Sequence, residues 1–325
     1  MATRGDLLRP FVELFKQFGA LFRVRLPLGH NLVVLAHPVA VEHVLRSRQD
    51  NYIKGSAYDG ARLLLGEGLL TSEGSHWRRQ RALANPAFRP SRLEQYLFVM
   101  GECTQQLIIS WETIAGTKRI DAREEMTQLT MAIVGRTLFG LDISQQSARA
   151  RGAFATALSA IGRRGPSNLQ IPLWLPTPGN LRFRKALRQL NTLVYEIIGN
   201  FRSDKAEGAD RTLLGAYLAA RDPDSGESMS DQELRDEVIT LYLARHETTA
   251  SLLTWPLYWL GRRPDVALRV ASEIDSMPMD DVPSLEQIKR LSYTSRFINE
   301  VLRLYPPAWT IARSPPRCGS GRGGS

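Results

Sequence analysis

The chain has 325 residues, of which 43% are hydrophobic and 23% are charged, the composition of a globular protein with a sizeable core. It has no run of about eighteen uncharged apolar residues, and its first residues, which include Arg4 and Arg9, lack the apolar core of a signal peptide. We therefore expect a cytoplasmic protein without a membrane span. The net charge of +9 comes without a Lys/Arg-rich block interleaved with aromatic residues, which argues against binding to nucleic acid. The two cysteines, Cys103 and Cys318, predict neither a disulfide framework nor a zinc site.

The N-terminal part predicts a helix followed by a small sheet. Residues 11–20 have the apolar spacing of a short amphipathic helix. Residues 21–36 alternate between apolar and polar side chains and then become rich in β-branched residues, which predicts two strands around a turn at Gly29 and His30. Pro38 then opens a helix at its first turn.

Beyond this region the pattern is helical. Apolar residues recur at steps of three and four, and the predicted helices span 91–114, 123–139, 181–202, 230–260, 264–283 and 284–304. Four prolines within 163–180 predict a loop there. Ser230 and Glu233 have the spacing of a capping box, with Ser230 as the N-cap of the long helix. We expect one mainly helical domain with a minor sheet.

The long helix contains the segment ARHETT, the first candidate for chemistry. Ala244 and Thr248 share a helical face, and the acid Glu247 beside the alcohol Thr248 can relay protons. His246 and Glu247 also match the first half of the HExxH motif of zinc proteases, but Ala250 stands where the second histidine would be. The remaining alternative is a polar patch without a chemical role.

Two further motifs pair a charged residue with a partner one helical turn away. Glu300 and Arg303 can form an ion pair, either on a solvated helix face or partly buried by the apolar residues around them. Trp77 and Arg81 offer an indole N–H and a guanidinium, which suit a carboxylate. The alternative for the second pair is a nonspecific basic helix.

The order of these motifs resembles the cytochrome P-450 family. A WxxxR helix is followed by A-x-x-E-T-T within a long helix and then by ExxR and Tyr-Pro-Pro, and the likeness covers roughly residues 10–313. It is greatest to bacterial members. The resemblance implies a mainly α, P-450-like helical domain with a small β-sheet, incomplete at its C-terminus.

The resemblance also implies a haem cofactor. Trp77 and Arg81 would bind one haem propionate, and Arg313 matches a second propionate contact. Ala244 would lie against the haem face. The iron ligand would be a cysteine thiolate from a later loop, whose electron donation favours O–O cleavage.

Other residues would then take part in catalysis or support it. Thr248 would hydrogen-bond the iron-bound oxygen, and Glu247 would help to deliver protons. Glu300 and Arg303 would form a buried network with another arginine. The family's reaction is haem-dependent insertion of one O2 oxygen into an apolar small molecule, with electrons from a ferredoxin or a flavoprotein reductase.

The sequence departs from the family pattern at three places. The domain predicted over 1–313 is followed by a Gly/Ser/Arg-rich tail, 314–325, in which Cys318 lacks the Phe and Gly of the ligand loop, so we expect no metal ligand and a disordered tail. Arg245 stands where the family has a glycine that opens a groove over the oxygen site. Pro256 lies inside the long helix and is expected to kink it.

These departures leave two alternatives to a working monooxygenase. For this chain the sequence favours a catalytically inactive, truncated or frameshifted product, in which residues from about 316 onward are read in the wrong frame. The other alternative is a helical binding protein that holds an apolar ligand without iron.

Overall fold

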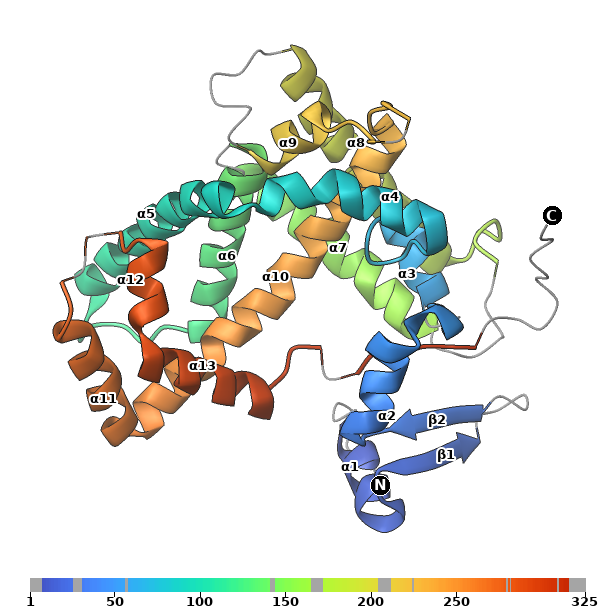
Figure 1. The fold of residues 1–325 in the computed structure, drawn as a ribbon. Helices are drawn as coiled ribbons and strands as arrows, with labels where there is room; N and C mark the ends of the chain where they lie inside the picture. Colours follow the sequence, from blue (N-terminus) through green and yellow to red (C-terminus); the bar gives the residue numbers. More distant parts are fainter. Residues whose placement is uncertain are drawn as a thin grey trace. The chain divides into compact units, whose positions relative to one another are not determined.

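The computed structural model describes residues 8–25, 31–55, 58–140, 144–164, 172–203, 212–223, 225–278, 280, 282–308 and 310–315 (Figure 1). Within its helices, the side chains at 139, 144–151, 163–164, 203 and 243–247 are not described. The contacts of the chain group it into two compact units. Unit 1 comprises Met1–Gly60, Ile161–Leu175 and Ala312–Ser325, and unit 2 comprises Ala61–Ala160 and Pro176–Ile311.

Unit 1 contains the sheet that the sequence predicts. Its elements are α1 (Arg9–Phe18), β1 (Leu21–Arg25), β2 (Asn31–Leu35), α2 (Pro38–Glu42), the π-helical turn η2 (His43–Ser47) and the 3-10 turn η3 (Gln49–Asn51). The two strands are antiparallel, with Leu21 opposite Leu35 and Arg25 opposite Asn31. The predicted helix, strand pair and Pro38 helix start are confirmed, whereas the turn at Gly29 and His30 lies outside the described residues.

One further backbone pairing holds unit 1 together across a long sequence separation. The N–H of Ile53 donates to the carbonyl of Ser314 and the N–H of Ser314 donates to the carbonyl of Ile53, both at 2.8 Å. Gly55 lies beside this bridge, and a Cβ at that position would meet the Ser314 hydroxyl at 2.0 Å.

The remaining elements are helical. They are α3 (Asp59–Leu65), α4 (Gly74–Ala84), η5 (Asn85–Phe88), α5 (Pro90–Ile114), α6 (Ala122–Phe139), α7 (Ser144–Arg164), α8 (Pro178–Ser203), α9 (Leu213–Ala219), α10 (Asp231–Arg262), α11 (Pro264–Asp275), α12 (Leu285–Arg290) and α13 (Ser292–Leu304). This mainly α chain with a two-stranded sheet confirms the predicted fold class. The ends of the predicted loop 163–180 are helical, because α7 reaches Arg164 and α8 begins at Pro178; residues 165–171 of that prediction lie outside the described residues.

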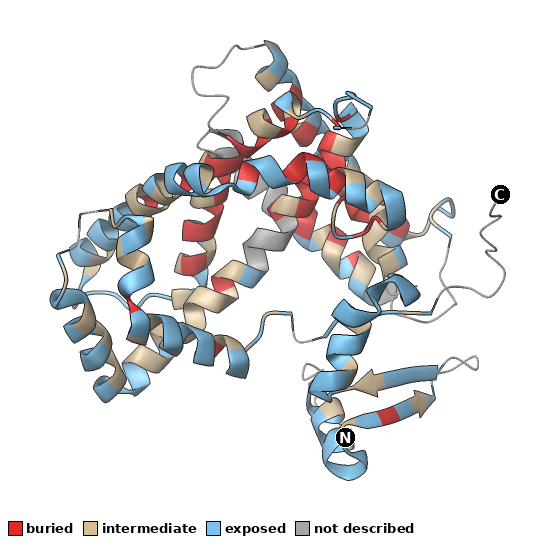
Figure 2. Cartoon of the chain, viewed as in Figure 1, coloured by how far each residue is buried: buried red, intermediate tan, exposed pale blue. Residues whose placement is uncertain are grey.

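The long helix α10 is the central element of unit 2. It packs against α6, α8 and α13, and the buried residues in Figure 2 gather on its N-terminal half and on α4, α6 and α9. The largest fully buried side chains include Leu64, Leu83, Phe183, Leu190, Tyr217, Leu234 and Ile239. By contrast, α11 and α12 bury no residue completely, and α13 buries only Val301.

The start of α10 follows the sequence prediction in detail. The hydroxyl of Ser230 accepts the N–H of Glu233 at 3.2 Å, and the Glu233 carboxylate accepts the N–H of Ser230 at 2.8 Å, which completes the capping box. The helix continues through Pro256 to Arg262. No described helix, α10 included, has the length and apolar character needed to cross a membrane.

The single helix predicted over 284–304 is wrong, because the chain forms two helices there. Leu291, between α12 and α13, leaves the helical region with φ −71° and ψ 71°. The Glu273 carboxylate of α11 then accepts the N–H groups of Tyr293 at 2.7 Å and Thr294 at 2.8 Å. These are free donors of a new helix N-terminus, so a residue distant in sequence stabilises the break.

Candidate functional site

Helix α4 presents the first predicted pair on an exposed face. Trp77 is 37% exposed and Arg81 is exposed, while Gln80, Leu83 and Ala84 on the other side of the helix are buried. Among the described residues, neither the indole of Trp77 nor the guanidinium of Arg81 makes a hydrogen bond or an ion pair. Both donors are therefore available to an acidic group outside the protein.

The ARHETT segment lies within α10, and the structure describes part of it. The side chains of Ala244 and Glu247, and that of Arg245 between them, lie outside the described residues. Thr248 is exposed, and Ala250 is only 2% exposed, in a cluster with Met126 of α6. Helix α10 therefore packs against α6 on one side and exposes Thr248 on another.

Helix α10 also binds the chain segment between α3 and α4, which we call the 66–73 loop. The buried carboxylate of Asp236 accepts the N–H of Glu67 at 2.8 Å, and that of Glu237 accepts the N–H of Leu69 at 2.9 Å. A spacing of seven and eleven residues at 100° per residue places Ala244 and Thr248 within about 20° of Glu237 around the helix axis. The loop is thus bonded to the same strip of α10 that carries these two residues.

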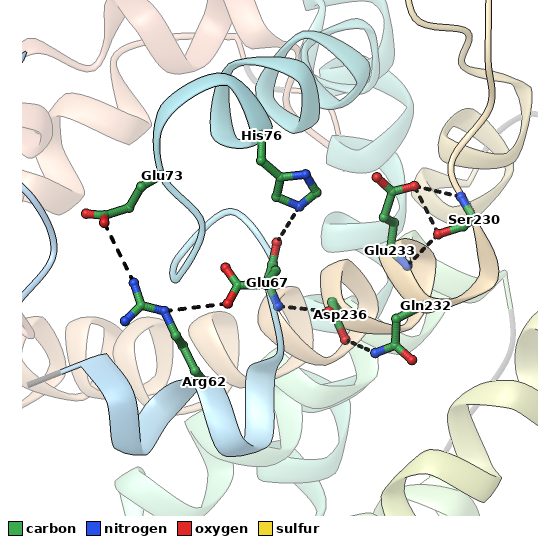
Figure 3. A pocket seen from close by; sticks show the side chains of 8 residues that line it. All are labelled: Arg62, Glu67, Glu73, His76, Ser230, Gln232, Glu233 and Asp236. Carbon is green, nitrogen blue, oxygen red and sulfur yellow. Dashed lines mark hydrogen bonds and ion pairs between the residues drawn. The ribbon is translucent and has the colours of Figure 1, made fainter. Parts of the chain in front are cut away.

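A polar cavity of about 570 Å³ opens beside this loop, at the start of α10 (Figure 3). It is lined by Arg62, Glu67, Glu73, His76, Ser230, Gln232, Glu233 and Asp236. Arg62 contacts both Glu67, at 3.6 Å, and Glu73, at 3.9 Å, so the guanidinium offsets the charge of these carboxylates. Within the described part of the chain, no three His, Cys, Asp or Glu side chains come together in a way that could hold a metal ion.

Glu233, another acid of this cavity, is paired with a cation and with its own helix N-cap. Arg79 of α4 forms an ion pair with it and contacts Asp222 at 3.3 Å. Burial acts to raise the pKa of Glu233, but the hydrogen bonds from Ser230 and the charge of Arg79 outweigh burial and lower it. Glu233 is therefore anionic at neutral pH and is paired with a cation of α4.

The ExxR pair forms as predicted but is not buried. Arg303 donates two hydrogen bonds of 2.7 Å to the Glu300 carboxylate, and these bonds and the cationic charge lower the pKa of Glu300. The side chains of Arg303 and Glu300 are 67% and 54% exposed, respectively, so within the described residues the pair lies on an exposed helix face. The buried network with an arginine further along the chain stays a prediction. On the same helix Val301 is buried, whereas the flanking Ile298 and Leu304 are exposed.

The remaining residues that the sequence singles out are Arg313 and the two cysteines. Arg313 is exposed and belongs to unit 1, where it precedes the bridge residue Ser314. Cys103 in α5 is only 4% exposed, and the Arg136 guanidinium donates to its sulfur at 3.5 Å. Cys318 lies beyond Pro315, the last described residue.

Sequence reasoning did not find the contacts of the 66–73 loop. Their two partners lie 168 and 169 positions away, in the segment LRDE at the start of α10. A sequence signal was present in the GEG at 66–68, because Gly66 has φ +62° and a Cβ there would meet the Asp236 carboxylate at 2.1 Å. Such glycines mark a close approach of the backbone to another element.

Comparison of the sequence with known protein families identifies its family. The family model described as "Cytochrome P450" matches residues 1–317, nearly the whole chain. The chain belongs to the cytochrome P-450 family. The resemblance that the three ordered motifs carry is therefore confirmed.

Curated relatives match the same P-450 region. The chain is 36% identical to "Cyclooctat-9-en-7-ol 5-monooxygenase" of Streptomyces melanosporofaciens, over 93% of this chain and 65% of that protein. It is also 36% identical to "Pentalenene oxygenase" of Streptomyces avermitilis, over 93% of this chain and 66% of that protein. A more distant relative, 27% identical over 92% of this chain and 28% of its own length, is "Bifunctional cytochrome P450/NADPH--P450 reductase" of Bacillus cereus. The chain spans just under two thirds of the length of the two Streptomyces relatives.

Haem is the cofactor of the P-450 family, and the side chains of Trp77 and Arg81 fit its propionate groups. Trp77 and Arg81 present an N–H and a guanidinium on one exposed face of α4, with no bond to another described residue; charge-assisted recognition of a carboxylate uses such donors. Among the described residues no cysteine is suited to bind the iron, because Cys103 is enclosed by α5, α6 and α10. The fit therefore concerns the propionates alone.

Proposed function

We propose that the protein acts as a haem-dependent monooxygenase that inserts one oxygen atom of O2 into an apolar small molecule. The observation that carries the proposal is the family match across residues 1–317. Haem, when bound, supplies the activation of O2. The alternative of a catalytically inactive product gains no support from the relatives, since two of those compared are named as oxygenases.

In this proposal, Trp77 and Arg81 bind a haem propionate. Their exposure on α4 and the absence of side-chain hydrogen bonds to other described residues support this role. A guanidinium can bind a carboxylate through two parallel hydrogen bonds, which fixes its orientation as well as its position. Arg313 is proposed as a second propionate contact on the family motif alone.

The α10 residues are proposed to control protons and space at the reacting oxygen. Thr248 holds a hydroxyl on an exposed face of α10, from which it can pass a proton, with Glu247 as the adjacent acid. Ala244, one turn earlier, leaves room beside it. Arg245 is a large cation within the same turn, at the position where the family has a groove-opening glycine. We propose that Arg245 narrows this space.

The relatives suggest the class of substrate and of electron donor. Two are named for cyclooctat-9-en-7-ol and pentalenene, so we propose a cyclic, terpene-like and largely apolar substrate. The Bacillus cereus relative is named as a fusion with a reductase, which supports an electron-transfer partner, either a flavoprotein reductase or a ferredoxin. A cytoplasmic location is part of the same proposal.

Titration of the purified chain with haem tests the propionate site. The variant Arg81→Ala is expected to weaken haem affinity about ten- to hundred-fold, since hydrogen bonds to charged groups contribute about 1.5–3 kcal/mol. The matched control is Arg78→Ala, which removes an exposed arginine from the same helix and leaves haem affinity unchanged. Equal effects of the two substitutions would show that only general charge matters.

The oxygen-site role is tested on the haem-loaded protein. The absorption band that gives the family its name comes from a haem bound by a cysteine thiolate, so it is measured on this chain joined to a family C-terminal part that carries the cysteine loop. A reduced carbon-monoxide complex without that band would contradict the proposed activity. Thr248→Ala is expected to separate electron use from product formation and to release peroxide. Thr248→Ser keeps the hydroxyl and serves as the control, so unchanged coupling in Thr248→Ala would refute the proposed role.

A further inference from the structure

We propose that Glu237, together with Asp236, is a positioning residue that fixes the 66–73 loop against the strip of α10 carrying Ala244 and Thr248. The loop is thereby a preorganised wall beside the proposed oxygen site at Ala244 and Thr248, and its placement affects the range of substrate sizes that this site accepts. The inference deepens the proposed function, and its catalytic part rests on that function.

The first evidence is the way the two carboxylates are held. Glu237 is fully buried, and one of its oxygens accepts the Leu69 N–H at 2.9 Å. Asp236 is 4% exposed and accepts three donors at 2.8 Å, from the Glu67 N–H, the Gln232 amide and the Arg235 guanidinium. Burying a carboxylate is costly unless it is hydrogen-bonded, so each acid depends on the loop N–H that it binds.

Side chains from two other helices bind the same loop. Arg62 of α3 donates to the Thr71 carbonyl at 3.0 Å, and the His76 ring of α4 lies 3.3 Å from the Glu67 carbonyl (Figure 3). Within the loop, the Thr71 hydroxyl donates to the carbonyl of Gly66 at 2.6 Å. The backbone polar groups of the loop are thus bonded by α3, α4 and α10 at once, as expected of a segment with one fixed conformation.

The second evidence is how close the loop lies to the proposed oxygen site. A Cβ built on Gly68 would meet the Thr240 hydroxyl at 2.4 Å and the Asp236 carbonyl at 2.8 Å, so the loop backbone touches α10 directly. At a rise of about 1.5 Å per residue, Ala244 lies about 6 Å further along the axis and Thr248 about 12 Å. A shift of the loop would therefore change the space about one helical turn from Ala244 on this strip of α10.

Amide hydrogen exchange tests the positioning role without haem. In Glu237→Leu, which removes the acceptor but keeps an apolar side chain of similar size, the Leu69 amide is expected to exchange about ten- to hundred-fold faster. Glu237→Gln retains an acceptor oxygen and should restore slow exchange. The control is Asp121→Ala, because Asp121 accepts the N–H groups of Arg123 and Glu124 at the start of α6 and should leave Leu69 unaffected.

Two outcomes overturn the positioning role. One is unchanged Leu69 exchange in Glu237→Leu, and the other is acceleration of amides throughout the chain to the same degree, which indicates global destabilisation. If Glu237→Leu does not fold, Glu237→Asp withdraws the carboxylate by one methylene and gives the same test. None of these measurements depends on the proposed monooxygenase activity.

Steady-state kinetics on haem-loaded protein test the consequence for selectivity. With two cyclic substrates of different size, Glu237→Leu is expected to change the ratio of their KM values about tenfold while kcat changes little, and Glu237→Gln should restore the ratio. An unchanged ratio in a variant whose loop exchange has accelerated would overturn the role in selectivity. Loss of haem binding by the unsubstituted chain would instead refute the proposed function and leave the exchange result standing.

Discussion

The close approach of the 66–73 loop to α10 makes Gly66 a sensitive position. Gly66 has φ +62°, and a Cβ there would lie 2.1 to 2.3 Å from the carboxylate atoms of Asp236. That carboxylate has little freedom to move, because Arg235 and Gln232 both donate to it at 2.8 Å. We therefore expect Gly66→Ala to destabilise the protein through two separate effects, backbone strain and a steric clash.

A second glycine separates the two effects. Gly74 has nearly the same φ, +59°, but no atom lies within 4 Å of a Cβ built on it. The left-handed conformation costs an L-residue roughly 1–2 kcal/mol, and alanine recovers about 0.4–1 kcal/mol by restricting the unfolded chain. Both variants share these contributions. Only Gly66→Ala adds overpacking, which costs about 1–3 kcal/mol.

Urea unfolding followed by helical circular dichroism measures the difference. Gly66→Ala is expected to have a free energy of unfolding about 1–3 kcal/mol below that of Gly74→Ala. If the two variants agree within about 0.5 kcal/mol, the limit to which independent substitutions usually add, the loop does not approach α10 as described.

Three other substitutions test separate parts of the structure. Leu64→Ala, at a fully buried position, should lower the free energy of unfolding by about 2–5 kcal/mol in the same urea assay. Although burial acts to raise the pKa of Glu273, hydrogen bonds from the start of α13 hold it at about 2 against an ordinary 4.5. The lowered pKa stabilises the folded protein fully above pH 4.5, and this stabilisation is lost as the pH falls towards 2. The melting temperature of Glu273→Gln should therefore depend less on pH between 4.5 and 2 than that of the unsubstituted protein. Arg79→Met should lower the free energy of unfolding by about 1–3 kcal/mol, because it removes the cation that pairs with Asp222 and Glu233. Arg79→Lys should recover part of the loss.

The confirmed predictions are those whose causes are local in sequence. The capping box at Ser230 and Glu233 involves residues three apart, so the sequence alone predicts it. The break within 284–304 cannot be predicted in this way, because its cap is Glu273, some twenty positions away on another helix. Apolar periodicity continues across such a break, so the pattern alone indicates one helix.

The candidate site also has features that local spacing predicts and features that depend on tertiary contacts. The pairs Trp77–Arg81 and Glu300–Arg303 follow from helical spacing, and their helices are confirmed. The exposure of the second pair depends on what covers α13, which spacing does not determine. The carboxylates that hold the 66–73 loop act through a tertiary contact, and an acid at the start of a helix is ordinarily explained by the helix dipole alone.

The pairing of Ile53 with Ser314 sets an order of events during synthesis. The two residues are 261 positions apart, and unit 1 takes its last segment from Ala312 onward. At about 5–20 residues per second, Ile53 waits on the order of 10–50 s for its partner, whereas the segments of unit 2 are complete before Ser314 is made. Unit 2 can therefore begin to fold first, and the edge of unit 1 at Ile53 stays without this partner throughout that interval. Chaperones that bind extended, unpaired segments would have this stretch available to them until the bridge closes.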